Sequence, residues 1–139
     1  MKDPSIMKPV FAQALLTFLL LLWMAKERLG AFRSGGVKPG EPGQRPQFTG
    51  KAGDVSNAFH NTLEMPMLFF AGIAFAILTD SVDWELNAFA WAYVVCRYAQ
   101  ALIHGTYNYI PHRFLAFLGS NIALIAIWTN TALHVLFGW

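Results

Sequence analysis

Polar side chains stand just before a long apolar stretch, LFFAGIAFAIL, in the middle of the chain. At about 100° per residue, four of them share one face, roughly 100° wide, of an expected helix. They are Asn57, His60, Asn61 and Glu64. Amides donate and accept hydrogen bonds, and imidazole and carboxylate groups can also take up or release a proton. This face could therefore bind a polar ligand or move a proton.

A second polar set follows in the next apolar segment. Arg97, Gln100 and His104 occur at positions i, i+3 and i+7, so they form one stripe along a helix. Arg113 opens the apolar segment after that one. Glu64 and Arg97 carry opposite charges and are candidates for an ion pair. The pair could belong to a binding site. Alternatively, it could only join two helices, and the asparagine side chains would then form further hydrogen bonds between them.

The elements that position these residues are expected to be membrane helices. Of 139 residues, 55% are hydrophobic and 13% are charged, so a soluble domain of this size would have more apolar surface than it could bury. Four segments fit spanning helices, at about 9–28, 54–80, 84–106 and 112–137. Residues 29–53 form a polar loop rich in Gly and Pro. We expect an all-α fold, one transmembrane four-helix bundle over residues 1–139.

The distribution of charge predicts the orientation of the bundle. Basic residues gather at the end of the first span and in the loop 29–53. The charged residues of the connection between the second and third spans are all acidic. The positive-inside rule then places this loop in the cytoplasm and both termini on the other side. The bases follow the membrane face and form no stripe for nucleic acid, so no nucleic-acid partner is expected.

The two polar sets therefore meet just inside the cytoplasmic boundary. A charged side chain within a span costs at least about 2.5 to 3.5 kcal/mol on insertion scales, so Glu64 and Arg97 must face the protein interior and find partners there. Three histidines lie near the same boundary, namely His60, His104 and His112. They belong to different expected helices, so no two of them have the i, i+4 spacing of paired ligands, and we expect no metal site.

The order of these residues also resembles a known family. Asn61 and Glu64 form an N-x-x-E motif followed by Pro66, and Arg97 precedes Arg113 by sixteen residues. Together with the segment RYAQALIHGTYNYIPHRFLAF, this pattern resembles the MAPEG family, the membrane-associated proteins in eicosanoid and glutathione metabolism, and in particular its bacterial members. The resemblance covers nearly the whole chain.

The resemblance implies a homotrimer with active sites between neighbouring subunits. Such a protein would bind glutathione from the cytoplasmic side as a co-substrate, and it would take a lipophilic small molecule from the lipid bilayer. The implied function is a glutathione-dependent transferase or peroxidase that acts on a lipophilic electrophile. The implied location is the bacterial inner membrane, as a multi-pass protein.

Residue roles follow from the resemblance by position. Glu64 and Asn61 would hold the glutathione peptide, and Arg97 would bind a carboxylate or brace Glu64. Arg113 would stabilise the thiolate, since a thiol with a pKa near 8.5 is little ionised at neutral pH and an adjacent cation raises that fraction. Arg28, at the cytoplasmic end of the first span, is a further candidate for a carboxylate.

Two positions depart from the pattern of eukaryotic members. Here His60 replaces an arginine and His104 replaces a tyrosine, so one carboxylate clamp is altered, and an imidazole stands where a hydroxyl could bond sulfur. His104 could serve as a general base or as a donor to sulfur, or it could only cap its helix. Asn57, Gln100 and Tyr107 complete the candidate binding residues.

Two other function classes remain open. A non-catalytic member of the same architecture would bind a lipid or assist a partner protein. A small proton-coupled exporter would have to use Glu64, because the first span has no acidic residue before its end.

Overall fold

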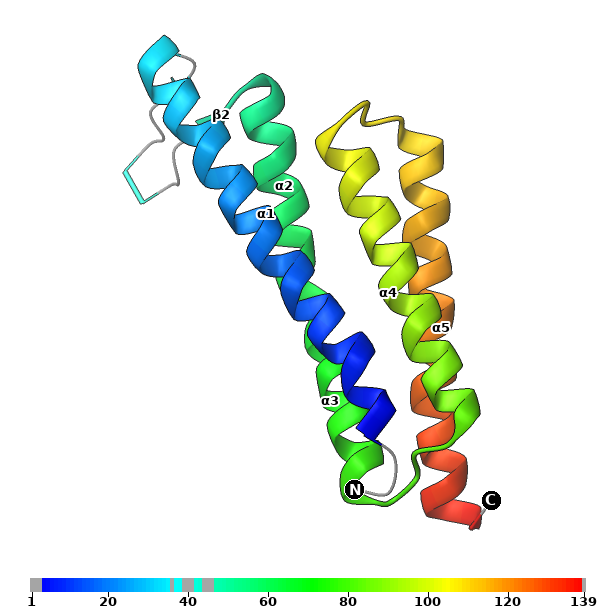
Figure 1. The fold of residues 1–139 in the computed structure, drawn as a ribbon. Helices are drawn as coiled ribbons and strands as arrows, with labels where there is room; N and C mark the ends of the chain where they lie inside the picture. Colours follow the sequence, from blue (N-terminus) through cyan, green and yellow to red (C-terminus); the bar gives the residue numbers. More distant parts are fainter. Residues whose placement is uncertain (1–3, 36, 39–41, 44–46, 139) are drawn as a thin grey trace.

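The computed structural model describes residues 4–35, 37–38, 42–43 and 47–138. The main elements are η1 (Pro4–Ile6), α1 (Met7–Ser34), α2 (Gly50–Glu64), α3 (Pro66–Leu78), α4 (Trp84–Gly105) and α5 (Ile110–Phe137). The short strands β1 (Val37–Lys38) and β2 (Gln47–Phe48) pair antiparallel in the connection after α1. The helical segments run alternately up and down, and both ends of the chain lie at the same end of the bundle (Figure 1). The expected all-α, four-helix architecture is confirmed.

Helix ends differ from the sequence expectation around the first connection. α1 continues to Ser34 and α2 begins at Gly50, so helix covers both ends of the stretch 29–53 that was expected to be loop. The expected ends rest on hydropathy, which shows only where a helix is apolar. The helix itself continues to the residue at which its backbone is capped. At the end of α1 this cap is Gly35, in the left-handed conformation with φ +73°.

Three helical stretches are long and apolar enough to cross a membrane within the described residues, namely 4–34, 50–78 and 110–137. α4 has 22 residues, or about 33 Å at 1.5 Å per residue, which also suffices for a hydrocarbon core of about 30 Å. Its apolarity is lower because it carries the stripe of Arg97, Gln100 and His104. All three side chains are buried, so α4 does not present this stripe to lipid.

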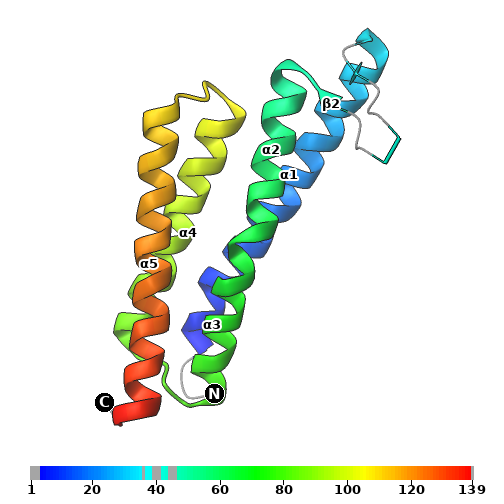
Figure 2. The same cartoon turned by 180° about the vertical axis from the view of Figure 1, so that it is seen from behind.

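The bundle consists of two helix pairs that also contact each other. α1 packs on α2, and α4 packs along most of α5 (Figures 1 and 2). α4 contacts α1 and α2 as well, and α3 contacts α5. In the half of the core nearest the termini, the rings of Phe69 and Tyr93 stack with centroids 4.5 Å apart. In the other half, Leu16, Leu20 and Ala101 pack together. This second half positions the polar stripe of α4.

Pro66 divides the second predicted helix into α2 and α3. Proline has no backbone N–H, so it cannot donate to the carbonyl four residues earlier, but it is well suited to the first turn of a helix. Met65 between the two helices keeps helical angles, with φ −69° and ψ −33°, and α3 continues close to the direction of α2 (Figure 2). The break therefore falls directly beside Glu64.

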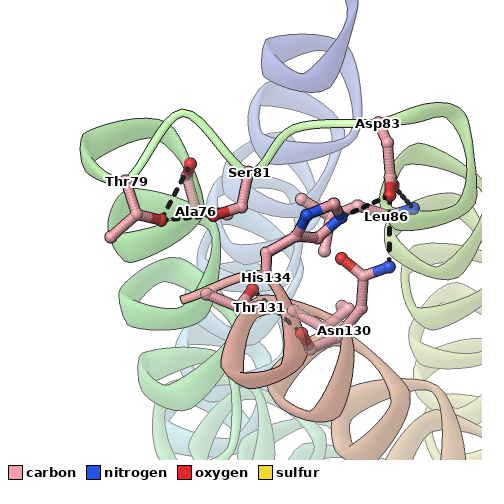
Figure 3. Close-up of polar contacts among 9 residues, drawn as sticks. Ala76, Thr79, Ser81, Asp83, Leu86, Asn130, Thr131 and His134 are labelled. Carbon is pink, nitrogen blue, oxygen red and sulfur yellow. Dashed lines mark hydrogen bonds and ion pairs between the residues drawn. The ribbon is translucent and has the colours of Figure 1, made fainter. Parts of the chain in front are cut away.

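The connection before α4 is held by Asp83 (Figure 3). Its carboxylate accepts the backbone N–H of Leu86 (2.7 Å) and thereby caps α4. The other carboxylate oxygen accepts His134 Nε2 (2.9 Å) and Asn130 Nδ2 (3.3 Å) from α5. Burial by itself raises the pKa of Asp83, but these hydrogen bonds outweigh it and hold the pKa below its ordinary value. Asp83 thus joins the start of α4 to the end of α5.

Candidate functional site

A cavity of about 260 Å³ opens between α2, α4 and the start of α5. α2 and the start of α5 lie in the half of the bundle that holds the α4–α5 turn (Figure 2). The polar lining consists of Asn61, Glu64, Arg97, Gln100, His104 and Arg113. The apolar lining consists of Met65, Ile110, Phe114 and Phe117. The two polar sets singled out in the sequence therefore meet around one space.

Arg97 is the most firmly held cation of the cavity. Its side chain is only 3% exposed. Nη1 donates to Oε1 of Gln100 (2.7 Å), one turn along α4, and Nη2 donates to the backbone carbonyl of Asn61 (2.6 Å). That carbonyl belongs to the last turn of α2, where backbone acceptors are available to other donors. The guanidinium group is thereby fixed between α2 and α4.

The ion pair expected between Glu64 and Arg97 is not formed in the described part of the chain, and this expectation is wrong as a direct contact. Arg97 takes the nearer acceptors of Gln100 and Asn61 instead. Glu64 is the last residue of α2, and its side chain is exposed at the cavity. Glu64 and Arg97 therefore line the same cavity without a direct bond between them in the described residues.

Asn61 also reaches His104, which is 5% exposed. Asn61 Nδ2 lies 3.4 Å from His104 Nδ1. An amide nitrogen can only donate, so this contact requires the tautomer of His104 that accepts at Nδ1 and carries its proton on Nε2. Asn61 thus orients Arg97 through its backbone and His104 through its side chain.

Arg113, at the start of α5, is held by residues that the sequence did not single out. Nη1 donates to Oδ1 of Asn108 (2.8 Å), and Asn108 Nδ2 donates to Oδ1 of Asp54 (3.2 Å). Asn108 lies in the α4–α5 turn with φ +45°, a left-handed conformation that asparagine tolerates better than most residues. An asparagine in a short interhelical turn is the signal that could have indicated this role. The chain of bonds joins α5 to α2.

Four other predicted site residues lie outside the described lining of the cavity. Asn57 is exposed on α2, and the half-buried His60 ring lies 5.7 Å from the ring of Phe59. Arg28 donates from Nε to Ser56 Oγ (3.1 Å), which ties α1 to α2. Tyr107 is exposed, and its hydroxyl lies 3.2 Å from His112 Nδ1. The structure brings the other six predicted residues together.

The lining combines charge with an apolar wall. Two guanidinium groups, from Arg97 and Arg113, can bind carboxylates or a thiolate, and the carboxylate of Glu64 can bind an ammonium group. On the α5 side, Ile110 and Phe114 are 65% and 58% exposed. The cavity can therefore hold a zwitterionic ligand on its polar side, next to an apolar ligand on its α5 side.

The fold and the cavity define a membrane helical bundle with a polar site near one end. The model of the MAPEG family matches residues 6–133, nearly the whole chain, so the protein belongs to the MAPEG family. No curated protein and no solved structure matches it. Family membership and the three apolar spans make it an integral membrane protein.

Proposed function

We propose that the protein is a glutathione-dependent transferase or peroxidase that acts on a lipophilic electrophile from the bilayer. The observation that carries this proposal is the cavity in which Arg97, Arg113 and Glu64 face the apolar wall of α5. The MAPEG family includes glutathione transferases and peroxidases. Glutathione, with two carboxylates, one ammonium group and a thiol, has the charges that this lining complements.

Binding of the peptide is assigned to the α2 and α4 side of the cavity. Arg97 is already fixed by two hydrogen bonds, so it can donate a further hydrogen bond to a glutathione carboxylate with little loss of side-chain freedom. Glu64 binds the ammonium group, and the amides of Asn61 and Gln100 bond to the peptide groups. The remaining candidates are assigned to the cavity of a neighbouring subunit in the proposed homotrimer, because they do not line the cavity of their own chain; they are Asn57, His60, Arg28 and Tyr107.

The chemical step is assigned to Arg113. Its guanidinium group places a positive charge beside the sulfur and so stabilises the thiolate over the thiol. The thiolate sulfur donates an electron pair to the electrophilic atom of the lipophilic substrate, and a sulfur bond forms as the bond to the leaving group breaks. The thiol gives its proton to water when it ionises, and the leaving group takes a proton from water in return, so protons balance over the step. His104 can donate a hydrogen bond from Nε2 to the leaving group as negative charge develops there.

The membrane placement belongs to the same proposal. The positive-inside rule places the cavity at the cytoplasmic face of a bacterial inner membrane, with both termini on the opposite side. Glutathione then enters from the cytoplasm, and the electrophile enters from lipid past Phe114 and Phe117.

Calorimetric titration of glutathione into the detergent-purified protein tests the proposal. We expect saturable binding, together with a thiolate absorbance band that Arg113→Ala loses while the oligomer stays intact. Loss of this one contact should cost at least about tenfold in thiolate stabilisation, since charge-assisted hydrogen bonds contribute about 1.5–3 kcal/mol. Arg33→Ala is the matched control, because Arg33 is an exposed arginine at the end of α1 that does not line the cavity.

The outcome separates the function classes. Absence of binding at millimolar glutathione would exclude the enzyme mechanism and favour a lipid-binding or partner-assisting scaffold. Proton-coupled efflux that is lost in Glu64→Gln, without glutathione binding, would instead favour an exporter.

A further inference from the structure

A second hollow lies between α1 and α4, away from the cavity described above. It has a volume of about 160 Å³ and is lined by Leu16, Leu19, Leu20, Trp23, Tyr98, Ala101 and Leu102. α1 and α4 lie toward the viewer in Figure 1, whereas α5, which lines the cavity, lies toward the viewer in Figure 2. We call this hollow the α1–α4 groove. Its lining shares no residue with that of the cavity.

The groove runs along the membrane depth. Leu16 and Trp23 mark its extent on α1, seven residues and thus about 10 Å apart at 1.5 Å per residue. Tyr98 and Leu102 follow the same direction on α4, and the Tyr98 hydroxyl donates to the backbone carbonyl of Ala12 (2.6 Å), which removes that polar group from the apolar surface. Leu19 and Leu102 are 49% and 57% exposed, so the groove is open at its side.

Trp23 closes one end of the groove at a defined level. Its ring lies directly on the backbone of Gly105, where an added Cβ would come within 2.5 Å of it. Its indole Nε1 donates to Glu27 (3.3 Å). Tryptophan with a polar partner on its N–H is typical of the boundary between lipid and water. This end of the groove therefore lies at the membrane surface.

The same end carries positive charge. Lys51 Nζ lies 5.7 Å from the centroid of the Trp23 ring, and the exposed Lys26 is one helical turn beyond Trp23 on α1. Two carboxylates of the described residues lie at this level, and each is already engaged. Glu27 accepts the indole N–H, and Asp54, one turn after Lys51 on α2, accepts Asn108 Nδ2. The ammonium groups of Lys26 and Lys51 can therefore attract an anion.

We propose that the α1–α4 groove binds an anionic phospholipid, with one acyl chain along Leu16, Leu19 and Leu102 and the head-group phosphate at Lys51. The apolar lining excludes a polar occupant, and the cation at the surface end selects an anionic head group. Trp23, held by its contacts with Glu27 and Gly105, sets the depth at which the glycerol backbone rests. This binding is independent of glutathione, so it can fail or succeed without regard to the proposed enzyme function.

Native mass spectrometry of the delipidated, detergent-solubilised protein tests the proposal, with phosphatidylglycerol and phosphatidylcholine of equal chain length as probes. We expect one saturable phosphatidylglycerol per chain, bound several-fold more tightly than phosphatidylcholine. Lys51→Ala should weaken phosphatidylglycerol binding about fivefold, the effect of one lysine near a membrane surface. It should weaken phosphatidylcholine binding clearly less, because the choline cation already balances the phosphate charge of that lipid. Leu19→Trp, which fills the groove from its open side, should weaken both.

Lys8→Ala is the matched control, since Lys8 is an exposed lysine near the opposite end of α1. Equal binding of the two lipids, or an equal effect of Lys8→Ala and Lys51→Ala, would overturn the proposal in favour of general charge attraction. A change of oligomeric state in Leu19→Trp would overturn it too, because the groove would then be covered by a second copy of the chain. Melting curves in detergent establish that each variant is folded.

Discussion

Asn61 contributes to the cavity through two different groups. Its backbone carbonyl accepts a hydrogen bond from Arg97, and its side-chain amide donates toward His104. A substitution at this position removes only the second contact, because the carbonyl is present in every residue. The orientation of Arg97 is therefore protected against mutation of Asn61, whereas that of His104 is not.

Asn108 is expected to position Arg113 without touching the substrate. Asn108→Gly keeps the backbone conformation but removes the bond to Arg113, so we expect a smaller thiolate absorbance with bound glutathione and an almost unchanged melting temperature. Asn108→Ala should show the same loss of thiolate and, in addition, about 1–2 kcal/mol of destabilisation from its left-handed backbone. Ultraviolet difference spectra and melting curves measure the two effects.

Asn87→Ala serves as the control for Asn108, since Asn87, at the start of α4, bonds to Ser5 and does not line the cavity. A full thiolate band in Asn108→Gly would show that Arg113 is positioned without Asn108.

At the scale of elements, Asp83 links two helices through one side chain. The pKa of Asp83 in the folded protein is lowered, so its contribution to stability is complete above the unfolded pKa of about 3.9 and is lost as the pH falls through the folded pKa. We expect the melting temperature in detergent to decrease as the pH is lowered from about 5 toward 3, and we expect Asp83→Asn to remove part of this decrease.

Glu85→Gln is the control for that measurement, because Glu85 is an exposed carboxylate in the first turn of α4. If Asp83→Asn and the parent protein lost stability in parallel with falling pH, other carboxylates would account for the acid sensitivity.

The contact of α1 with α4 depends on a glycine, Gly105, on which the Trp23 ring packs. Gly105→Ala would place a Cβ within 2.5 Å of the Trp23 ring, so the ring must move, and we expect a lower melting temperature and a shift in tryptophan fluorescence. Gly30→Ala on α1 meets nothing within 4 Å and should stabilise its helix by about 0.5–1 kcal/mol. An equal gain of stability in both variants would show that Trp23 does not rest on Gly105.

The whole molecule presents different chemistry on its two broad faces. The cavity faces outward between α2 and α5, and the α1–α4 groove lies on the other side of α4. A neighbouring subunit of the proposed trimer could cover the first face and leave the second one to lipid. The helix α4 serves both, since Arg97 and Gln100 line the cavity while Tyr98 and Leu102 line the groove.

The sequence by itself determined the membrane class and the four helices, and its motifs indicated the family. The class and the helices depend on local patterns, namely hydropathy and helical periodicity. The stripe of Arg97, Gln100 and His104 belongs here too, because helical spacing alone places its members on one face.

Only the tertiary structure decided which partners these residues take. Arg97 bonds to Asn61 and Gln100 rather than to Glu64. The sequence could not predict this choice, because helical periodicity indicates which face a residue lies on but not which acceptor on a neighbouring helix is nearer. The bond from Asn108 to Asp54 joins residues 54 positions apart. Its formation depends on how closely α2 approaches the α4–α5 turn, and that approach follows from the packing of the whole bundle.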